Sequence, residues 1–343
     1  MSDYFETGFV VGQASGHRKE NLLVEAPPTA EEALVAAGLD WEVKECPLFF
    51  NTPHVLSDDT PAGIITTSMR ALVRSTDNLI LGTCEDRYQV FQNREGFQWC
   101  APLVETGWWK FETGGSLLNG KVCWVLLRQD ETEIVPNDKL LRYLLVTWNH
   151  TGRVANVIKL TSTRVVCWNT ICAALAGAGA KSTISHFESM AMKYKEIQAY
   201  YLSTTAAFAR QEEWCRRLVD TKMTDGALEQ YVDTVFPPAY MMPDGGLDLT
   251  DRMTAQLNNV NNRVKELVMD GKAAGTDVLG IRSTAWGAFN GVTQYIEYEQ
   301  GSDQIKDRGW RILFGAGAEA QNRAAVILAD LVGVPLPEGV TVN

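Results

Sequence analysis

The chain has 343 residues and a net charge of −11, with 31 Lys and Arg against 42 Asp and Glu, which excludes a protein that coats nucleic acid with its entire surface. It has no run of about 18 apolar residues, and its first residues lack the basic-then-apolar order of a signal peptide. We therefore predict a cytoplasmic protein without a transmembrane helix. Seven cysteines, scattered mostly beside apolar residues, indicate reduced core thiols and not a disulfide framework.

The charge is unevenly distributed along the chain. Residues 1–138 carry 10 basic against 21 acidic side chains, residues 139–222 carry 12 against 5, and residues 223–343 carry 9 against 16. A basic centre between acidic flanks is what a localised polyanion-binding surface requires. The same pattern also fits a long helix with a solvated basic face, so both interpretations stay open.

Residues 1–67 predict an N-terminal arm and connector. The segment "TAEEALVAAGLD", residues 29–40, has a short helical pattern, and we expect Thr29 to cap the helix together with Glu32. A connector rich in Pro and Asp comes next.

Residues 68–183 predict an α+β core with a mostly antiparallel sheet and packed helices. β-branched and aromatic runs alternate with short turns at residues 76–78, 85–86, 114–120 and 151–152, which is typical of hairpins. The segment "YQVFQN" is predicted as a strand, "REGFQWCAPLVETG" as a helix, and "TICAALA" as a second helix. Regular alternation of strands and helices, as in a parallel doubly wound sheet, is missing.

Residues 184–343 predict a helical region packed on that core. Aromatic residues recur at seven-residue intervals from Phe187 to Phe208, with Cys215 continuing the interval, which indicates one long amphipathic helix over residues 185–221. Helical patterns follow to the end of the chain, interrupted by the Pro- and Gly-rich segment 236–246.

Two familiar ligand motifs are absent by spacing. The run "AGAGAKST" resembles a phosphate-binding loop, but the motif requires Gly where Ala180 and Leu175 stand. Cys167 and Cys172 lie five residues apart, whereas structural zinc sites pair ligands two to four residues apart, twice. We expect neither a cofactor nor a metal.

Catalytic residues are also poorly indicated. His150 is the best general-base candidate in the core, and Cys167 or Ser162 could partner it, but no spacing demands this arrangement. A His150 that hydrogen-bonds the adjacent turn is the alternative. We expect a binding protein more than an enzyme.

The junction around Arg164, Asn169 and Thr170 is the candidate anion site. A basic residue with amide and hydroxyl groups at the start of a helix suits a phosphate. The alternative is structural, with Asn169 capping the helix and Arg164 paired to a carboxylate. Exposed aromatics such as Trp168 could stack on unpaired bases, although most aromatics of this segment should be core.

Four segments carry a family resemblance: "LGTCEDRYQVFQN", "GGSLLNGKVCWVLLR", "NHTGRVANVIKLTSTRVVCWNTICAAL" and "TAWGAFNGVTQYIEY". Between about Ser68 and Leu331 the chain resembles the phage/plasmid-like proteins, a family of uncharacterised function carried by mobile elements. It departs from the family pattern at Trp168, where a polar residue is usual. The resemblance implies a role in DNA replication, recombination or repair, or in countering a host defence. By fold-level analogy it also points to single-strand annealing recombinases.

The sequence therefore predicts a DNA-binding protein of a mobile element that holds single-stranded DNA by charge and stacking and acts as a homo-oligomer in recombination. The predicted nucleic-acid-binding residues are Lys159, Arg164, Trp168, Asn169, Thr170, Lys181, Lys193, Lys195, Arg216 and Arg217. The alternative hypothesis is a counter-defence protein that binds and neutralises a host protein through its acidic surfaces. A membrane partner is not expected.

Overall fold

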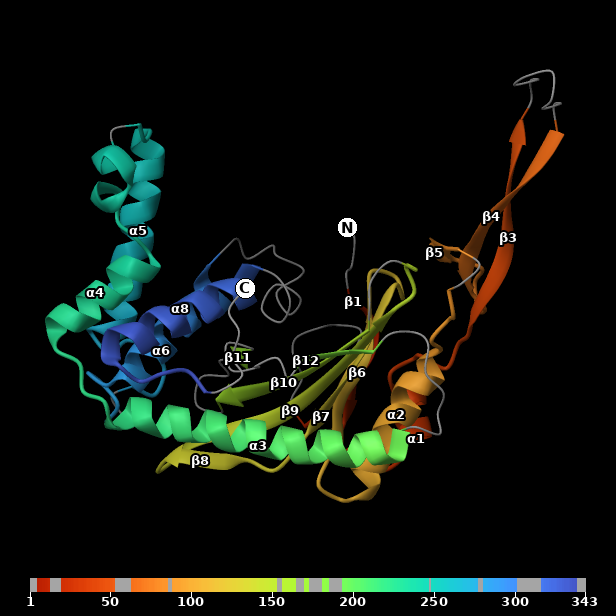
Figure 1. The fold of residues 1–343 in the computed structure, drawn as a ribbon, viewed down its shortest axis with the longest axis horizontal. Coiled ribbons are helices and arrows are strands. Elements are labelled where there is room, and N and C mark those ends of the chain that lie inside the picture. Colours follow the sequence, from red (N-terminus) through yellow and green to blue (C-terminus); the bar gives the residue numbers. More distant parts are fainter. Residues whose placement is uncertain are drawn as a thin grey trace. The chain divides into compact units, whose positions relative to one another are not determined.

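The computed structural model confirms an α+β protein, with sheets in the first half of the chain and helices in the second (Figure 1). It describes residues 5–12, 20–52, 63–85, 88–152, 156–164, 170–172, 181–184, 193–246, 248–276, 280–300 and 316–337.

The strands form a nine-stranded and a three-stranded sheet. Their bounds are β1 (Phe5–Val11), β2 (Glu20–Leu23), β3 (Val43–Thr52), β4 (Gly63–Arg74), β5 (Ile80–Cys84), β6 (Lys110–Leu117), β7 (Val122–Arg128), β8 (Thr132–Val135), β9 (Asp138–Asn149), β10 (Asn156–Arg164), β11 (Thr170–Cys172) and β12 (Lys181–Ile184). The large sheet has the order β11-β10-β9-β7-β6-β1-β2, with β12 paired to β10 and β8 to β9, and the small sheet has the order β3-β4-β5. The pairs β1–β6, β6–β7, β8–β9, β10–β11, β3–β4 and β4–β5 are antiparallel, whereas β1–β2 is parallel.

The helices begin at residues that the sequence marks well. Their bounds are α1 (Ala30–Ala36), α2 (Asn93–Glu105), α3 (Lys193–Asp220), α4 (Asp225–Val235), α5 (Asp251–Val268), α6 (Ala285–Gln294) and α8 (Ala316–Val332), with 3₁₀ turns η2 (Ala239–Met241) and η3 (Pro243–Gly246) and a π-helical turn η4 (Tyr295–Glu299). The predicted cap of α1 is confirmed, because the Thr29 hydroxyl accepts a hydrogen bond from the Glu32 amide at 3.2 Å. Thr224, Thr250 and Thr284 cap α4, α5 and α6 in the same way.

The predicted hairpin β4–β5 is confirmed, with Asn78 in the left-handed conformation of its turn (φ 59°). The strand predicted for "YQVFQN" is wrong: residues 88–92 are irregular, and α2 follows them. The side chains of Gln92 and Glu95 explain why the chain forms a helix start and not a strand at this point. The Gln92 amide exchanges two hydrogen bonds of 2.9 Å with the backbone of Val43, and the Glu95 carboxylate accepts from the Gln92 N–H at 2.7 Å, which starts the helix.

The helix predicted for "TICAALA" is also wrong over Thr170–Cys172, which form β11. These residues pair with β10 in the register Thr161↔Cys172, Ser162↔Ile171 and Thr163↔Thr170. β-branched Thr and Ile favour an extended partner strand over a helix, and the ladder satisfies their backbone groups. Residues 173–180, which hold the glycine-rich run, lie outside the described residues. The predicted long helix is described as α3 from Lys193 onward, and residues 185–192 are likewise outside that description.

The chain divides into two compact units. Unit 1 comprises Met1–Arg128, Leu144–Ile158 and Ser182–Ala199, and unit 2 comprises Gln129–Tyr143, Lys159–Lys181 and Tyr200–Asn343. Unit 1 contains most of the sheet strands together with α1 and α2. β1 lies between β2 and β6, so this first strand is an inner strand of the large sheet, although it belongs to the segment predicted as an arm. The largest fully buried side chains of unit 1 are aromatic: Phe9, Phe97, Trp109, Phe111 and Trp148.

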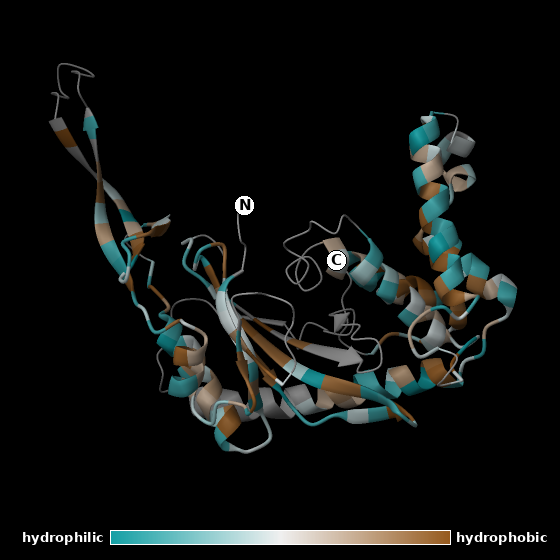
Figure 2. Cartoon of the chain, turned by 180° about the vertical axis from the view of Figure 1, so that it is seen from behind, coloured by the Kyte–Doolittle hydropathy of each residue, from teal (hydrophilic) through white to brown (hydrophobic). Residues whose placement is uncertain are grey.

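Unit 2 has a helical core. Trp214 of α3, Tyr231 of α4, Leu267 of α5, Trp286 and Phe289 of α6 belong to one buried cluster, to which α8 contributes as well. In α5 the buried residues all lie between Asn261 and Val268, so its first half is largely exposed. Figure 2 shows the same contrast, with hydrophobic colour at the base of the helices and hydrophilic colour along much of α5.

Candidate nucleic-acid interface

His150 is part of the packed interior of unit 1. It is fully buried, and its Nε2 lies 2.8 Å from Asn93 Oδ1, which also accepts a hydrogen bond from Trp148 Nε1 at 2.9 Å. The Asn93 amide nitrogen donates to the carbonyls of Leu39 and Trp41. Because the Asn93 oxygen can only accept, His150 Nε2 carries the proton in this arrangement. Burial and this hydrogen bond favour a structural role for His150 over that of a general base. Its predicted partner Cys167 lies outside the described residues.

Cys46, Cys100, Cys123 and Cys215 are thiols and not members of disulfides. Burial raises the pKa of the Cys100 and Cys215 thiols well above the ordinary range, so both stay protonated at neutral pH. Within the described residues, no group of three His, Cys, Asp or Glu side chains is placed to hold a metal ion.

The predicted binding residues fall on two sets of elements. Lys159 and Arg164 are in β10, and Thr170 and Lys181 begin β11 and β12. Since β10 is hydrogen-bonded to both β11 and β12, these four backbone positions lie on neighbouring strands. The other predicted residues are in α3, with Lys193 and Lys195 at its start and Arg216 and Arg217 near its end. Trp168 and Asn169 lie outside the described residues.

One argument for the Arg164 junction is overturned. Thr170 is the first residue of a strand and not of a helix, so no helix N-terminus presents free N–H groups to an anion at this position. The interpretation of Asn169 as a helix cap loses its basis for the same reason.

Part of the basic centre is neutralised within the protein. Lys139 forms an ion pair with Glu131, and Arg142 pairs with Glu212 while lying over the ring of Phe208 at 5.7 Å. Because Glu212 is almost buried, this pair fixes α3 to β9 within unit 2. Arg142 is therefore structural, whereas Lys139 is paired with Glu131 at the surface.

Arg216 is partly engaged as well. Its guanidinium donates to the Glu133 carbonyl at 3.3 Å and lies 3.8 Å from Glu212, yet half of its side chain is exposed. A half-exposed guanidinium held by one carbonyl keeps several N–H donors directed to solvent. Arg216 is thus a positioned cation at the surface.

Three further cations extend this surface. Arg210, Arg217 and Lys222 are exposed, and among the described residues none of their side chains has an ion pair or hydrogen-bond partner. Arg210 and Arg217 lie seven residues apart, about two helical turns, and therefore share a face of α3. Exposed Glu213 lies between them and weakens the positive potential. Arg217 also complements the negative end of the α3 dipole, which is the structural alternative to a binding role.

Sequence reasoning missed Arg210, which was not among the predicted residues. The available signal was its seven-residue interval to Arg217, on the side opposite buried Phe208 and Cys215. Core packing is confirmed for those two members of the heptad series. Tyr143, Trp148 and Trp214 are buried too, so these aromatics of the basic segment cannot stack on bases.

A membrane-crossing helix, with the necessary length and apolar character, does not occur among the helices that the structure describes. A family model described as "Domain of unknown function (DUF932)" matches residues 80–316, well over half of the chain. Neither a curated protein nor a solved structure matches the chain.

Proposed function

The chain belongs to the family described as domain of unknown function (DUF932), and that description names no activity. From the charges of the chain itself, we propose that it binds single-stranded DNA through the basic residues of α3 and of strands β10–β12. One observation supports the proposal: the basic residues of segment 139–222 are concentrated on a few strands and one long helix. Lys139 and Arg142 are paired within the protein, and the other described cations of the segment lie on β10, on β12, on α3 and between α3 and α4.

The chemistry follows from the exposed donors near the end of α3. Arg210, Arg216 and Arg217 offer guanidinium groups to solvent, and these bind phosphate oxygens through charge-assisted hydrogen bonds. Each neutralised phosphate of a single strand contributes about −0.7 to the slope of log K against log salt, because condensed counterions are released. A site with three such contacts has an expected slope near −2 from this helix alone.

An acidic protein with a local basic surface suits a strand that must be bound and released. The acidic flanks oppose binding elsewhere on the surface, so a polyanion is directed to the basic elements. Within α3, Glu213 moderates the attraction further. We therefore propose binding of moderate affinity and strong salt dependence, without sequence preference, because contacts to the phosphate backbone carry no sequence information.

We extend the proposal to a biological setting from the family resemblance. A phage- or plasmid-borne protein with these properties would align complementary strands in recombination, as an oligomer and without a nucleotide cofactor. The support for this step is analogy with single-strand annealing recombinases and the resemblance to the phage/plasmid-like proteins.

The direct test is a titration of the full chain with fluorescent oligo(dT) of 40 nucleotides at several salt concentrations, followed by fluorescence anisotropy. We expect an affinity that falls steeply between low and moderate salt. A stopped-flow measurement of strand annealing with complementary oligonucleotides tests the extension separately. Affinity that does not change with salt, or no binding at low salt, contradicts the proposal, whereas binding without annealing contradicts only the extension.

A further inference from the structure

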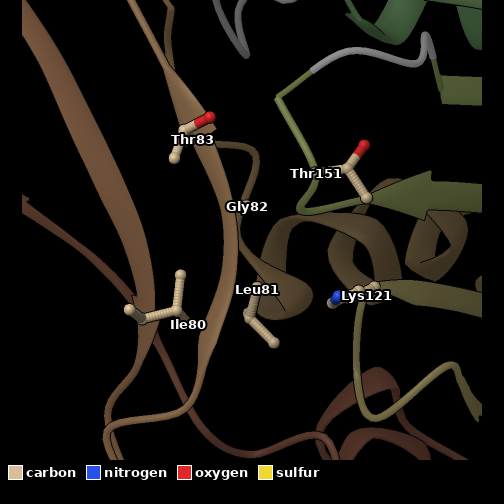
Figure 3. Close-up of a pocket in the computed structure, with 6 residues that line it drawn as sticks. All are labelled: Ile80, Leu81, Gly82, Thr83, Lys121 and Thr151. Atoms are coloured by element: carbon tan, nitrogen blue, oxygen red, sulfur yellow. The ribbon is translucent and has the colours of Figure 1, made fainter.

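A depression on the surface of unit 1 lies between β5 and two turns of the large sheet (Figure 3). Its volume is about 330 Å³, and it is lined by Ile80, Leu81, Gly82, Thr83, Lys121 and Thr151. In Figure 3, β5 forms one wall, and Lys121 and Thr151 come from the opposite side. Ile80 is 57% exposed, so the depression presents apolar surface beside polar groups.

Two glycines bring the walls together. A Cβ atom on Gly82 would lie 2.5 Å from the backbone of Thr151, and one on Gly152 would lie 2.3 Å from the Thr83 carbonyl oxygen. Gly152 also has a φ of 76°, which favours glycine. The backbones of β5 and of the turn after β9 are therefore in direct contact, and this contact fixes one end of the depression.

Lys121 lies on the wall of the depression that faces β5, directly after a turn with an uncommon backbone conformation. Leu118, Asn119 and Gly120 all have positive φ, at 55°, 59° and 81°. The turn packs on Arg74 and Trp41, because a Cβ on Gly120 would lie 3.0 and 3.1 Å from those side chains. A non-glycine residue such as Leu118 adopts this conformation at a cost, so the surrounding structure must enforce it. The Lys121 carbonyl then accepts a hydrogen bond from the His150 N–H at 2.8 Å.

Two of the three side-chain donors that line the depression, those of Lys121 and Thr83, are not engaged by any residue in the described part of the chain. Lys121 is only half-buried, and no described residue forms an ion pair or hydrogen bond with its amine. The Thr83 hydroxyl has no described hydrogen-bond partner either, and it points toward the Thr151 side of the depression in Figure 3. The Thr151 hydroxyl, in contrast, donates to Asn149 Oδ1 at 2.7 Å.

We propose that this depression binds the anionic head, phosphate or carboxylate, of a small organic molecule. The Lys121 ammonium supplies the charge and up to three donors, the Thr83 hydroxyl supplies a fourth, and Ile80 contacts an apolar portion of the ligand. A volume of this size accommodates one nucleotide or a comparable metabolite, not a folded domain.

This inference is independent of the DNA-binding proposal. The depression belongs to unit 1, whereas Arg210 and Arg217 belong to unit 2. Variants of α3 should therefore leave the depression unchanged, and variants of Lys121 should leave the α3 contribution to DNA binding unchanged.

The test is isothermal titration calorimetry of the full chain with three probes at constant ionic strength: sodium phosphate, thymidine 5′-monophosphate and sodium butyrate. Phosphate and the nucleotide distinguish a phosphate head from the carboxylate of butyrate. We expect saturable binding of at least one probe. Lys121→Ala should weaken it about tenfold, since a hydrogen bond to a charged group is lost, and Thr83→Val should weaken it by less.

Lys110→Ala is the matched control, because Lys110 is an exposed lysine of β6 in the same unit but does not line the depression. Its probe affinity should equal that of the unmodified protein. If Lys121→Ala does not fold, Lys121→Gln and Thr83→Val provide the comparison. Saturable binding of no probe, or equal affinity in the Lys121 variants, overturns the proposal.

Discussion

Two arginines, one in each unit, have opposite surroundings. Arg74 of unit 1 is buried, donates to Asp77 and Glu6, and lies over the ring of Trp41 at 5.4 Å. Arg217 of unit 2 is exposed, and no described side chain pairs with it. A fully engaged cation holds a fold together, whereas an exposed cation without a partner can bind an external anion. Burial and pairing therefore distinguish structural cations from candidate binding cations, whereas residue type does not, since both residues are arginines.

The largest effect is expected at Asn93, whose side chain joins α2 to β9 and to the segment before β3. Asn93→Ala removes the partner of Trp148 Nε1, of His150 Nε2 and of two backbone carbonyls, all inside the core. We expect a loss of about 4 kcal/mol in the free energy of unfolding, measured by urea denaturation. Asn259→Ala, at an exposed position of α5, should change it by less than about 0.5 kcal/mol. Equal effects of the two variants would refute the structural role of the cluster.

Arg74 comes next. Arg74→Met keeps the aliphatic volume but leaves Glu6, itself largely buried, without its guanidinium partner at 2.7 Å. Breaking such a pair from one side should cost about 3 kcal/mol, measured by the same denaturation. An exposed pair offers the contrast: Arg94→Met breaks the ion pair with Glu31 on the surface and should cost under about 1 kcal/mol. A cost for Arg74→Met no larger than this would remove the distinction between engaged and surface arginines.

The pH dependence of the Arg74 effect has a definite sign. The Arg74 guanidinium lowers the pKa of Asp77 from its ordinary value to about 2. Because the folded-state pKa is depressed, this interaction stabilises the protein fully above the unfolded pKa near 4, and its contribution is lost as the pH falls toward 2. The difference in unfolding free energy between the unmodified protein and Arg74→Met should therefore shrink between pH 4 and pH 2. A difference that stays constant over this interval would show that Asp77 contributes nothing to it.

Smaller effects are expected at two glycines with opposite surroundings. Gly82→Ala forces a Cβ to within 2.5 Å of the Thr151 backbone and should cost about 1 to 3 kcal/mol. Gly226→Ala, in α4, meets no atom within 4 Å and should stabilise the protein by a few tenths to about 1 kcal/mol through helix propensity. Thermal denaturation should move the midpoint in opposite directions, and a shift of the same sign would contradict the close contact of β5 with the turn after β9.

Much of the fold could be predicted from local signals. Thr29 with Glu32 marks a helix start, and the turn at Asn78 marks a hairpin, because in both cases the information lies within a few residues. The wrong predictions concern segments whose conformation depends on contacts with residues far away in the sequence. The Gln92 side chain is hydrogen-bonded to the backbone of Val43, and Thr170–Cys172 form a strand that pairs with β10. Neither contact can be read from the local sequence pattern.

The candidate site was predicted less well than the fold. Charge counting located the basic segment, but it could not tell that Arg142 is paired with Glu212 or that Arg210 is exposed. Burial and pairing arise from packing between segments far apart in the chain, so composition alone cannot separate structural cations from available ones. His150 illustrates the same point, since its partner Asn93 lies 57 residues away.

The most direct measurement of the central claim is the salt dependence of oligo(dT) binding by Arg210→Gln/Arg217→Gln. We predict that its slope of log K against log salt is smaller in magnitude than that of the unmodified protein by about 1.4, which corresponds to two lost phosphate contacts. Arg323→Gln is the matched control, because Arg323 is an exposed arginine of α8 in the same unit and has no described ion-pair partner. Its slope should equal that of the unmodified protein. Identical slopes for all three proteins would contradict the assignment of α3 as a nucleic-acid interface.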